Sequence, residues 1–130
     1  IEVVQKNKSV FLLEAIRNLF YLKSEYLDTV IQELINKATA MGSNEIIKST
    51  IGLRDRHQNL YVLEEKANKI AILQAQNDPI IPLQEMDEQL GLLKRKPEYL
   101  LIENSGHMSI WENPKATNRI LSEILKDCEV

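Results

Sequence analysis

Apolar and polar positions follow a helical period in the first half of the chain and a different pattern in the second half. The clearest period lies between Ser24 and Gly42, where apolar side chains recur every three or four positions, at Leu27, Val30, Ile31, Leu34, Ile35, Ala38 and Met41. This spacing places them on one face of an amphipathic helix. We expect Ser24 to cap the start of this helix and Gly42 to end it.

Three further helices are predicted in the first half of the chain. One begins with Ser9 as its cap and runs to about residue 20 or 22, and a second begins at Ser43 and ends near Gly52. A third spans about residues 58–66, with leucines spaced to share one face. The first half is therefore predicted to be all helical.

The pattern changes after residue 69. Two short, continuous apolar runs occupy residues 70–73 and 99–102, as is typical of strands that are covered on both faces of a parallel sheet. A helical period fills residues 82–93 between them. Asn113 and Pro114 make a good helix start, a cap followed by a first-turn proline, and an apolar stripe follows. The second half is therefore predicted as strand, helix, strand, helix, with parallel strands.

Polar residues follow each predicted strand. Asp78 comes soon after the first strand, and Gly106 and His107 follow the second. In open α/β sheets, ligands bind beyond the carboxyl ends of the strands, so both side chains are placed where chemistry would occur. Asp78 could instead be a turn residue and His107 a loop residue. We favour function for both, because a carboxylate beside an imidazole can orient it and stabilise its protonated form.

The sequence around these residues resembles the C-terminal part of the α/β-hydrolase family. The matching motifs are Asp78-Pro79-Ile80-Ile81-Pro82 and Gly106-His107-Met108-Ser109-Ile110-Trp111-Glu112-Asn113-Pro114. The resemblance, to a capped bacterial esterase-like member, implies an α/β fold in which a helical cap precedes the acid- and histidine-bearing end of the core. It implies that residues 1–56 form the helical cap, or lid, and that residues 57–130 form the C-terminal part of the core.

The resemblance also implies roles for individual residues. Asp78 corresponds to the acid of a catalytic triad and His107 to its general base, and Met108 and Trp111, close behind the histidine, either line the substrate pocket or belong to the core. No cofactor is implied. The family's nucleophile lies in a G-x-S-x-G elbow, and that pattern occurs nowhere in these residues. We therefore expect the nucleophile upstream of this chain, and the chain alone to be inactive.

Other interpretations stay open at this stage. A dehalogenase or epoxide hydrolase would keep the same histidine but use an aspartate nucleophile, and a ligand-binding or receptor protein could use the same fold without turnover. A small helical interaction module is the least favoured alternative. Ser43 and Ser105 are poor nucleophile candidates, because neither lies in a sharp turn between strand and helix. His57, among charged neighbours, is interpreted as a surface residue.

Composition narrows the classes of partner. The 130 residues carry a net charge of −3 and 44% hydrophobic residues, which suits a globular protein and gives little support to nucleic-acid binding. The single cysteine permits no internal disulfide, in keeping with a cytoplasmic location. No apolar run is long enough for a membrane span, and no cluster suits a metal.

Because two strands make a marginal sheet, we expect the chain to pair with a missing N-terminal half or with another copy. The expected ligand is a small-molecule substrate.

Overall fold

The computed structural model describes residues 2–128, apart from the side chains of Val3, Asp127 and Cys128. The single cysteine side chain therefore lies outside the described part. The chain forms two compact units. Unit 1 comprises Ile1–Asn18 and Lys23–Gln58, and unit 2 comprises Leu19–Leu22 and Asn59–Val130. The four residues Leu19–Leu22 thus belong to unit 2 although both of their sequence neighbours belong to unit 1.

Unit 1 is helical. Its elements are α1 (Glu2–Lys6), α2 (Lys8–Arg17), α3 (Glu25–Thr39) and α4 (Ser43–Arg54). A small core joins α1, α2 and α4 through the buried side chains of Val4, Leu12 and Ile46. Helix α3 packs on α2 and buries four residues of its predicted apolar stripe, Leu27, Val30, Ile31 and Ile35. The amphipathic pattern read from the sequence is therefore confirmed for this helix.

Three of the predicted helix ends in unit 1 need correction. Asn7, not Ser9, caps α2, because its Oδ1 accepts a hydrogen bond from the Val10 N–H. Helix α2 ends at Arg17 with Asn18 as its C-cap, and the predicted extension to residue 20 or 22 falls on residues that belong to unit 2. Gly42 is the N-cap of α4 rather than the end of α3, and Ser43 is the first helical residue. The predicted Ser24 cap is confirmed by a 3.2 Å bond to the Leu27 N–H.

The end of α3 is held by a charged side chain instead of a glycine. The Nζ of Lys8 donates to the carbonyl oxygens of Thr39 at 2.8 Å and Met41 at 2.9 Å. A cation at a helix C-terminus satisfies carbonyls that have no partner within the helix and complements the helix dipole. Gly42 adopts a φ of −66°, so its conformational freedom is not used there.

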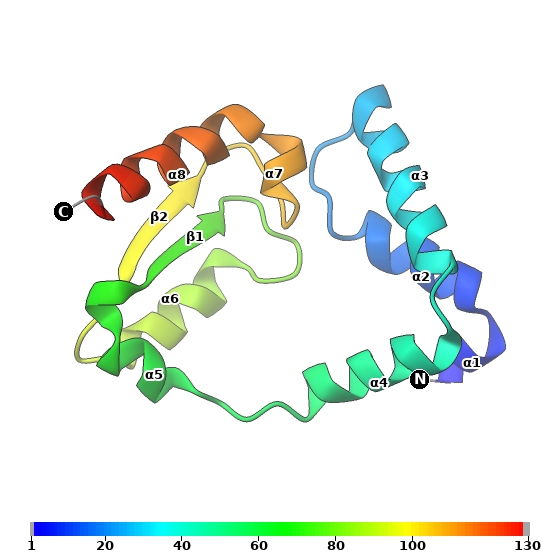
Figure 1. Cartoon of the computed structure of the whole chain (residues 1–130), viewed down its shortest axis with the longest axis horizontal. Helices are drawn as coiled ribbons and strands as arrows, with labels where there is room; N and C mark the ends of the chain where they lie inside the picture. The colour runs from blue at the N-terminus through cyan, green and yellow to red at the C-terminus, as the bar shows by residue number, and fades with distance from the viewer. Residues whose placement is uncertain (1, 129–130) are drawn as a thin grey trace. The chain divides into compact units, whose positions relative to one another are not determined.

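Unit 2 contains strand, helix, strand and helix in the predicted order. Its elements are α5 (Leu60–Glu65), the 3₁₀ turn η1 (Ala67–Lys69), β1 (Ala71–Ala75), α6 (Leu83–Gly91), β2 (Glu98–Ile102), α7 (Ser109–Glu112) and α8 (Pro114–Cys128). Strands β1 and β2 pair in parallel, with Ala71 opposite Glu98 and Ala75 opposite Ile102. Helix α8 packs on β2 (Figure 1). The α/β fold class with parallel strands is confirmed.

The cover over the two strands is incomplete. Ile102 is 2% exposed, whereas its neighbour Leu101 is 44% exposed. Within residues 2–128 the sheet holds only β1 and β2, so the second edge of β1 has no partner strand. The expectation of strands covered on both faces is thus met at Ile102 but not at Leu101. The short helix α7 was not predicted, because four residues are too few to show a helical period.

Candidate active site

Asp78 and His107 meet beyond the carboxyl ends of the two parallel strands. The Nδ1 of His107 lies 2.9 Å from Oδ2 of Asp78. The Asp78 side chain is 7% exposed and that of His107 is 34% exposed. The expected hydrogen bond between them is thus present, and both loops that carry these residues lie at the same end of the sheet (Figure 1). The catalytic roles of the two residues stay predictions.

The two carboxylate oxygens of Asp78 have separate tasks. Oδ1 accepts hydrogen bonds from the Ile80 N–H at 2.8 Å and the Ile81 N–H at 2.9 Å, so it holds the turn that follows. Oδ2 is left for the histidine. An ionised carboxylate can only accept, so the bond assigns the imidazole proton to Nδ1. In the neutral ring, Nε2 then carries the free lone pair that a general base needs.

The loops that carry these residues are fastened to each other. Beyond the sheet, the Gln76 N–H donates to the Ile102 carbonyl and the Asn77 N–H donates to the Ser105 carbonyl, both at 2.9 Å. The side chain of Gln76 also accepts from the Asn104 N–H at 3.2 Å. Asn104 has a φ of 50°, a left-handed conformation that asparagine tolerates better than most residues. These bonds extend the register of the strands into the loops and bring the aspartate and histidine together.

A buried glutamine, Gln74 in β1, holds the loop that follows this strand. Gln74 is 4% exposed, and its Nε2 donates to the Ile81 carbonyl at 2.8 Å. Burying an amide without such a partner would be costly. Gln74 thus closes the loop 76–81 across its base. In the sequence, Gln74 is only one polar residue at the end of an apolar run, and this role could not be predicted from that pattern.

The loop that carries the histidine approaches the segment Leu19–Leu22 closely. A Cβ placed on Gly106 would lie 2.7 Å from the Tyr21 backbone nitrogen and 2.8 Å from Oε2 of Glu112. No glycine in the described part of the chain has a positive φ. Gly106 is therefore needed for this close approach, and not for an unusual backbone conformation.

The structure also places the remaining candidate residues from the sequence analysis. Ser105 is fully buried and its hydroxyl donates to the Ile102 carbonyl at 3.0 Å, so it is engaged as a structural residue. His57 is exposed. Met108 is half-buried and Trp111 is 36% exposed, on the turn and helix that follow His107. Their part in substrate binding stays a prediction.

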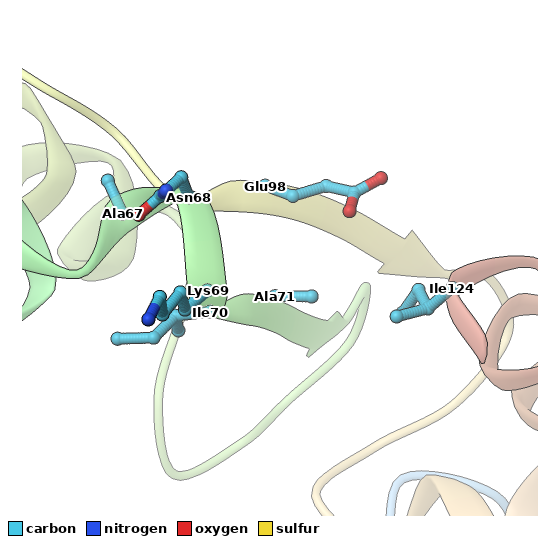
Figure 2. A pocket seen from close by; sticks show the side chains of 7 residues that line it. All are labelled: Ala67, Asn68, Lys69, Ile70, Ala71, Glu98 and Ile124. Carbon is cyan, nitrogen blue, oxygen red and sulfur yellow. The ribbon is translucent and has the colours of Figure 1, made fainter. Parts of the chain in front are cut away.

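Two cavities lie at the opposite end of the strands from the aspartate and histidine. One, of about 430 Å³, is lined by the start of β1, by Glu98 at the start of β2 and by Ile124 of α8 (Figure 2). The other, of about 440 Å³, lies beside Ala67, Asn68, Arg95 and Lys96. Neither cavity is lined by Asp78 or His107, so neither is the expected substrate pocket.

The described residues contain neither a metal-binding cluster nor a helix that could span a membrane. No cluster of three or more histidine, cysteine, aspartate or glutamate side chains there could hold a metal ion. Among the described helices, none combines the length and the apolar character that crossing a membrane requires.

No family model matches the chain. No curated protein matches it either. A solved structure does: an esterase from Exiguobacterium antarcticum, with a TM-score of 0.73 and 18% sequence identity over 96% of this chain and 45% of the esterase. The chain has an esterase-like α/β fold. At this identity the likeness speaks for the fold alone, and the chain spans less than half the length of that esterase.

Proposed function

We propose that the chain is the C-terminal part of an α/β-fold hydrolase that acts on an ester or a similar small carbonyl substrate. Asp78 and His107 would be two members of its triad, with a serine nucleophile in a segment upstream of Ile1. The observation that carries the proposal is the 2.9 Å contact between the two side chains beyond the ends of parallel strands. The esterase-like fold supports the same function.

The proposed reaction uses His107 first as a base and then as an acid. Nε2 takes the proton of the serine hydroxyl as its oxygen attacks the substrate carbonyl, and Asp78 stabilises the imidazolium that forms. The imidazolium then protonates the leaving alcohol, which departs and leaves an acyl-enzyme. Water attacks the acyl group after losing its proton to Nε2, and the serine takes that proton back as the acid product leaves.

A cap, a substrate pocket and the upstream half complete the proposed enzyme. Residues 1–56 act as the helical cap over the substrate, and Met108 and Trp111 line the pocket beside His107. The upstream half supplies the nucleophile and the donors that stabilise the oxyanion. No cofactor takes part.

Labelling with a fluorophosphonate tests the proposal in the full-length protein that contains this chain. This probe bonds covalently to an activated serine, so we expect one labelled upstream serine and hydrolysis of short nitrophenyl esters. Labelling should vanish in His107→Ala, because the serine would lose its base. Turnover of alkyl halides or epoxides without labelling would instead indicate an aspartate nucleophile. Ligand binding without any turnover would overturn the hydrolase and indicate a receptor.

The chain of 130 residues offers a matched comparison. Because triad members act as a unit and the nucleophile forms the covalent bond, the isolated chain should not hydrolyse nitrophenyl esters. Mixing it with the upstream half, made as a separate polypeptide, should restore turnover. Hydrolysis by the isolated chain at a rate similar to that of the full-length protein would contradict an upstream nucleophile.

A further inference from the structure

Glu112 gathers three backbone N–H groups from two distant parts of unit 2. Its Oε1 accepts from Tyr21 and Leu22, both at 2.7 Å, and its Oε2 accepts from Gly106 at 2.8 Å. Tyr21 and Leu22 are about 90 residues away in sequence, whereas Gly106 directly precedes His107. One carboxylate therefore joins the histidine loop to the segment Leu19–Leu22.

This arrangement needs both carboxylate oxygens. Hydrogen bonds from neutral donors to an ionised acceptor are about twice as strong as those between neutral groups. The Glu112 side chain is half-buried. Its three donors are backbone N–H groups, which cannot rotate away as side-chain donors can. Gly106 has no space for a Cβ against Tyr21 and Glu112, so the loop is also held by direct contact.

These bonds fix the backbone that leads to His107. On its amino side the loop is held at Ser105, whose carbonyl accepts from Asn77, and at Gly106 by Glu112. Glu112 is the last residue of α7, five positions after the histidine. The backbone just before His107 is thus held by Glu112, and the ring is held by Asp78.

We propose that Glu112 is a positioning residue that fixes the backbone of the histidine loop and ties it to Leu19–Leu22. This role rests on the proposed function, since it serves His107 as the general base. Leu19–Leu22 is continuous in sequence with unit 1 at both ends. A displacement of this segment would therefore act on the histidine loop through Glu112 and through the close contact of Gly106 with Tyr21. The bonds of Glu112 go to backbone N–H groups and not to Asp78 or the ring, so it takes no part in proton transfer.

Glu112→Gln in the full-length protein tests the proposal. The glutamine has the same shape, but its NH₂ group must face either Gly106 or the Tyr21 and Leu22 pair, where a donor meets donors. We expect kcat to fall by about 10- to 100-fold with KM unchanged, because a misplacement of about 1 Å can cost about 100-fold in rate. Glu123→Gln on the exposed surface of α8 is the matched control and should keep normal kcat.

A second readout does not depend on activity. The ¹⁵N shifts of the His107 ring report its tautomer, which the Asp78 bond holds with the proton on Nδ1. In Glu112→Gln we expect a mixture of tautomers, together with faster hydrogen exchange at the Gly106, Tyr21 and Leu22 amides. A folded Glu112→Gln protein with an unchanged ring and kcat within about twofold of wild type would overturn the proposal.

The two readouts separate this proposal from the proposed function. If the full-length protein hydrolyses nothing, the hydrolase proposal fails while the NMR comparison still decides the positioning role. If Glu112→Gln lowers activity only in proportion to the loss of folded protein, with the ring of the folded fraction unchanged, Glu112 is a structural residue and the positioning role is overturned.

Discussion

Asp78 gives one carboxylate oxygen to its own loop and the other to His107, at 2.9 Å. The first oxygen fixes the acid without the help of the histidine, and the second then fixes the ring. Because the acid is 7% exposed, water competes little for this bond. The pair is therefore already in place in this chain, and variants of the two residues should have different effects on turnover and stability.

Replacement of His107 by alanine should remove most turnover of the full-length protein. The histidine serves as both base and acid in the proposed reaction, and loss of a triad member in a serine hydrolase can cost about 10⁶-fold in kcat. The thermal midpoint should also fall somewhat, because Oδ2 of the buried Asp78 side chain loses its hydrogen-bond partner. Steady-state kinetics on a nitrophenyl ester measures the loss. His57→Ala, at the other histidine, is the control, and near-normal turnover of His107→Ala would remove His107 from the mechanism.

Asp78→Asn should keep the conformation of the loop but lose most of the catalytic activity. The asparagine oxygen can still accept from Ile80 and Ile81, while its NH₂ group faces His107 Nδ1 and favours the tautomer with the proton on Nε2. By analogy with the equivalent change in a serine protease, kcat should fall about 10⁴-fold. Asp87→Asn on exposed α6 should be neutral. A loss of kcat under tenfold would show that Asp78 does not orient the base.

The parallel pair of strands and the aspartate–histidine contact could be predicted because their signals are local. Each strand is one continuous apolar run, and each polar residue follows a strand within a few positions. Parallel strands bring their carboxyl ends to the same edge, so two local signals were enough to predict one contact across 29 residues.

What could not be predicted depends on contacts between distant segments. Nothing in Leu19–Leu22 marks it as part of unit 2, and the bonds of its backbone to Glu112 cross about 90 residues. Every residue except proline carries the same backbone N–H group, so the sequence does not show which partner such a group will bind. The end of α3 was misassigned for a similar reason: Lys8, 31 positions away from Thr39, replaces the expected glycine.

Tyr99→Phe should stabilise the protein, and more so at high pH. The Oη of Tyr99 is buried and has no hydrogen-bond partner among the described residues, and such a group costs about 1–3 kcal/mol. Burial, with a smaller effect of the Asp87 charge, raises the pKa of Tyr99 above 10.0. We therefore expect Tyr99→Phe to raise the free energy of unfolding by about 1 kcal/mol at neutral pH.

The pH dependence follows from the direction of that shift. Below the unfolded-state pKa of about 10, Tyr99 is neutral in both states and its contribution is constant. As pH rises through the raised pKa of the folded state, the unfolded state loses its proton first, so stability falls. Urea unfolding at several pH values should show this fall in the wild type and a smaller one in Tyr99→Phe. Tyr61→Phe, at a 63% exposed tyrosine, should behave as the wild type does.

The chain of 130 residues should not behave as a stable monomer in solution. The outer edge of β1 lacks a partner strand within the described residues, and unpaired strand edges favour association. Helix α8 also exposes Leu121 and Leu125, which share a face at a spacing of four. We propose that the upstream half covers these groups in the full-length protein, and that a second copy covers them in its absence.

Sedimentation velocity at low concentration measures this association. The chain alone should sediment as a species heavier than its monomer mass of 15.0 kDa, and adding the upstream half as a separate polypeptide should convert it into a one-to-one complex. Leu125→Glu should weaken self-association, because a charge on that face would have to be buried without a partner. Leu53→Glu, at a leucine of similar exposure on helix α4 of unit 1, should leave it unchanged. A compact 15.0 kDa monomer that does not bind the upstream half would contradict both the proposed partner and the open edge as its docking site.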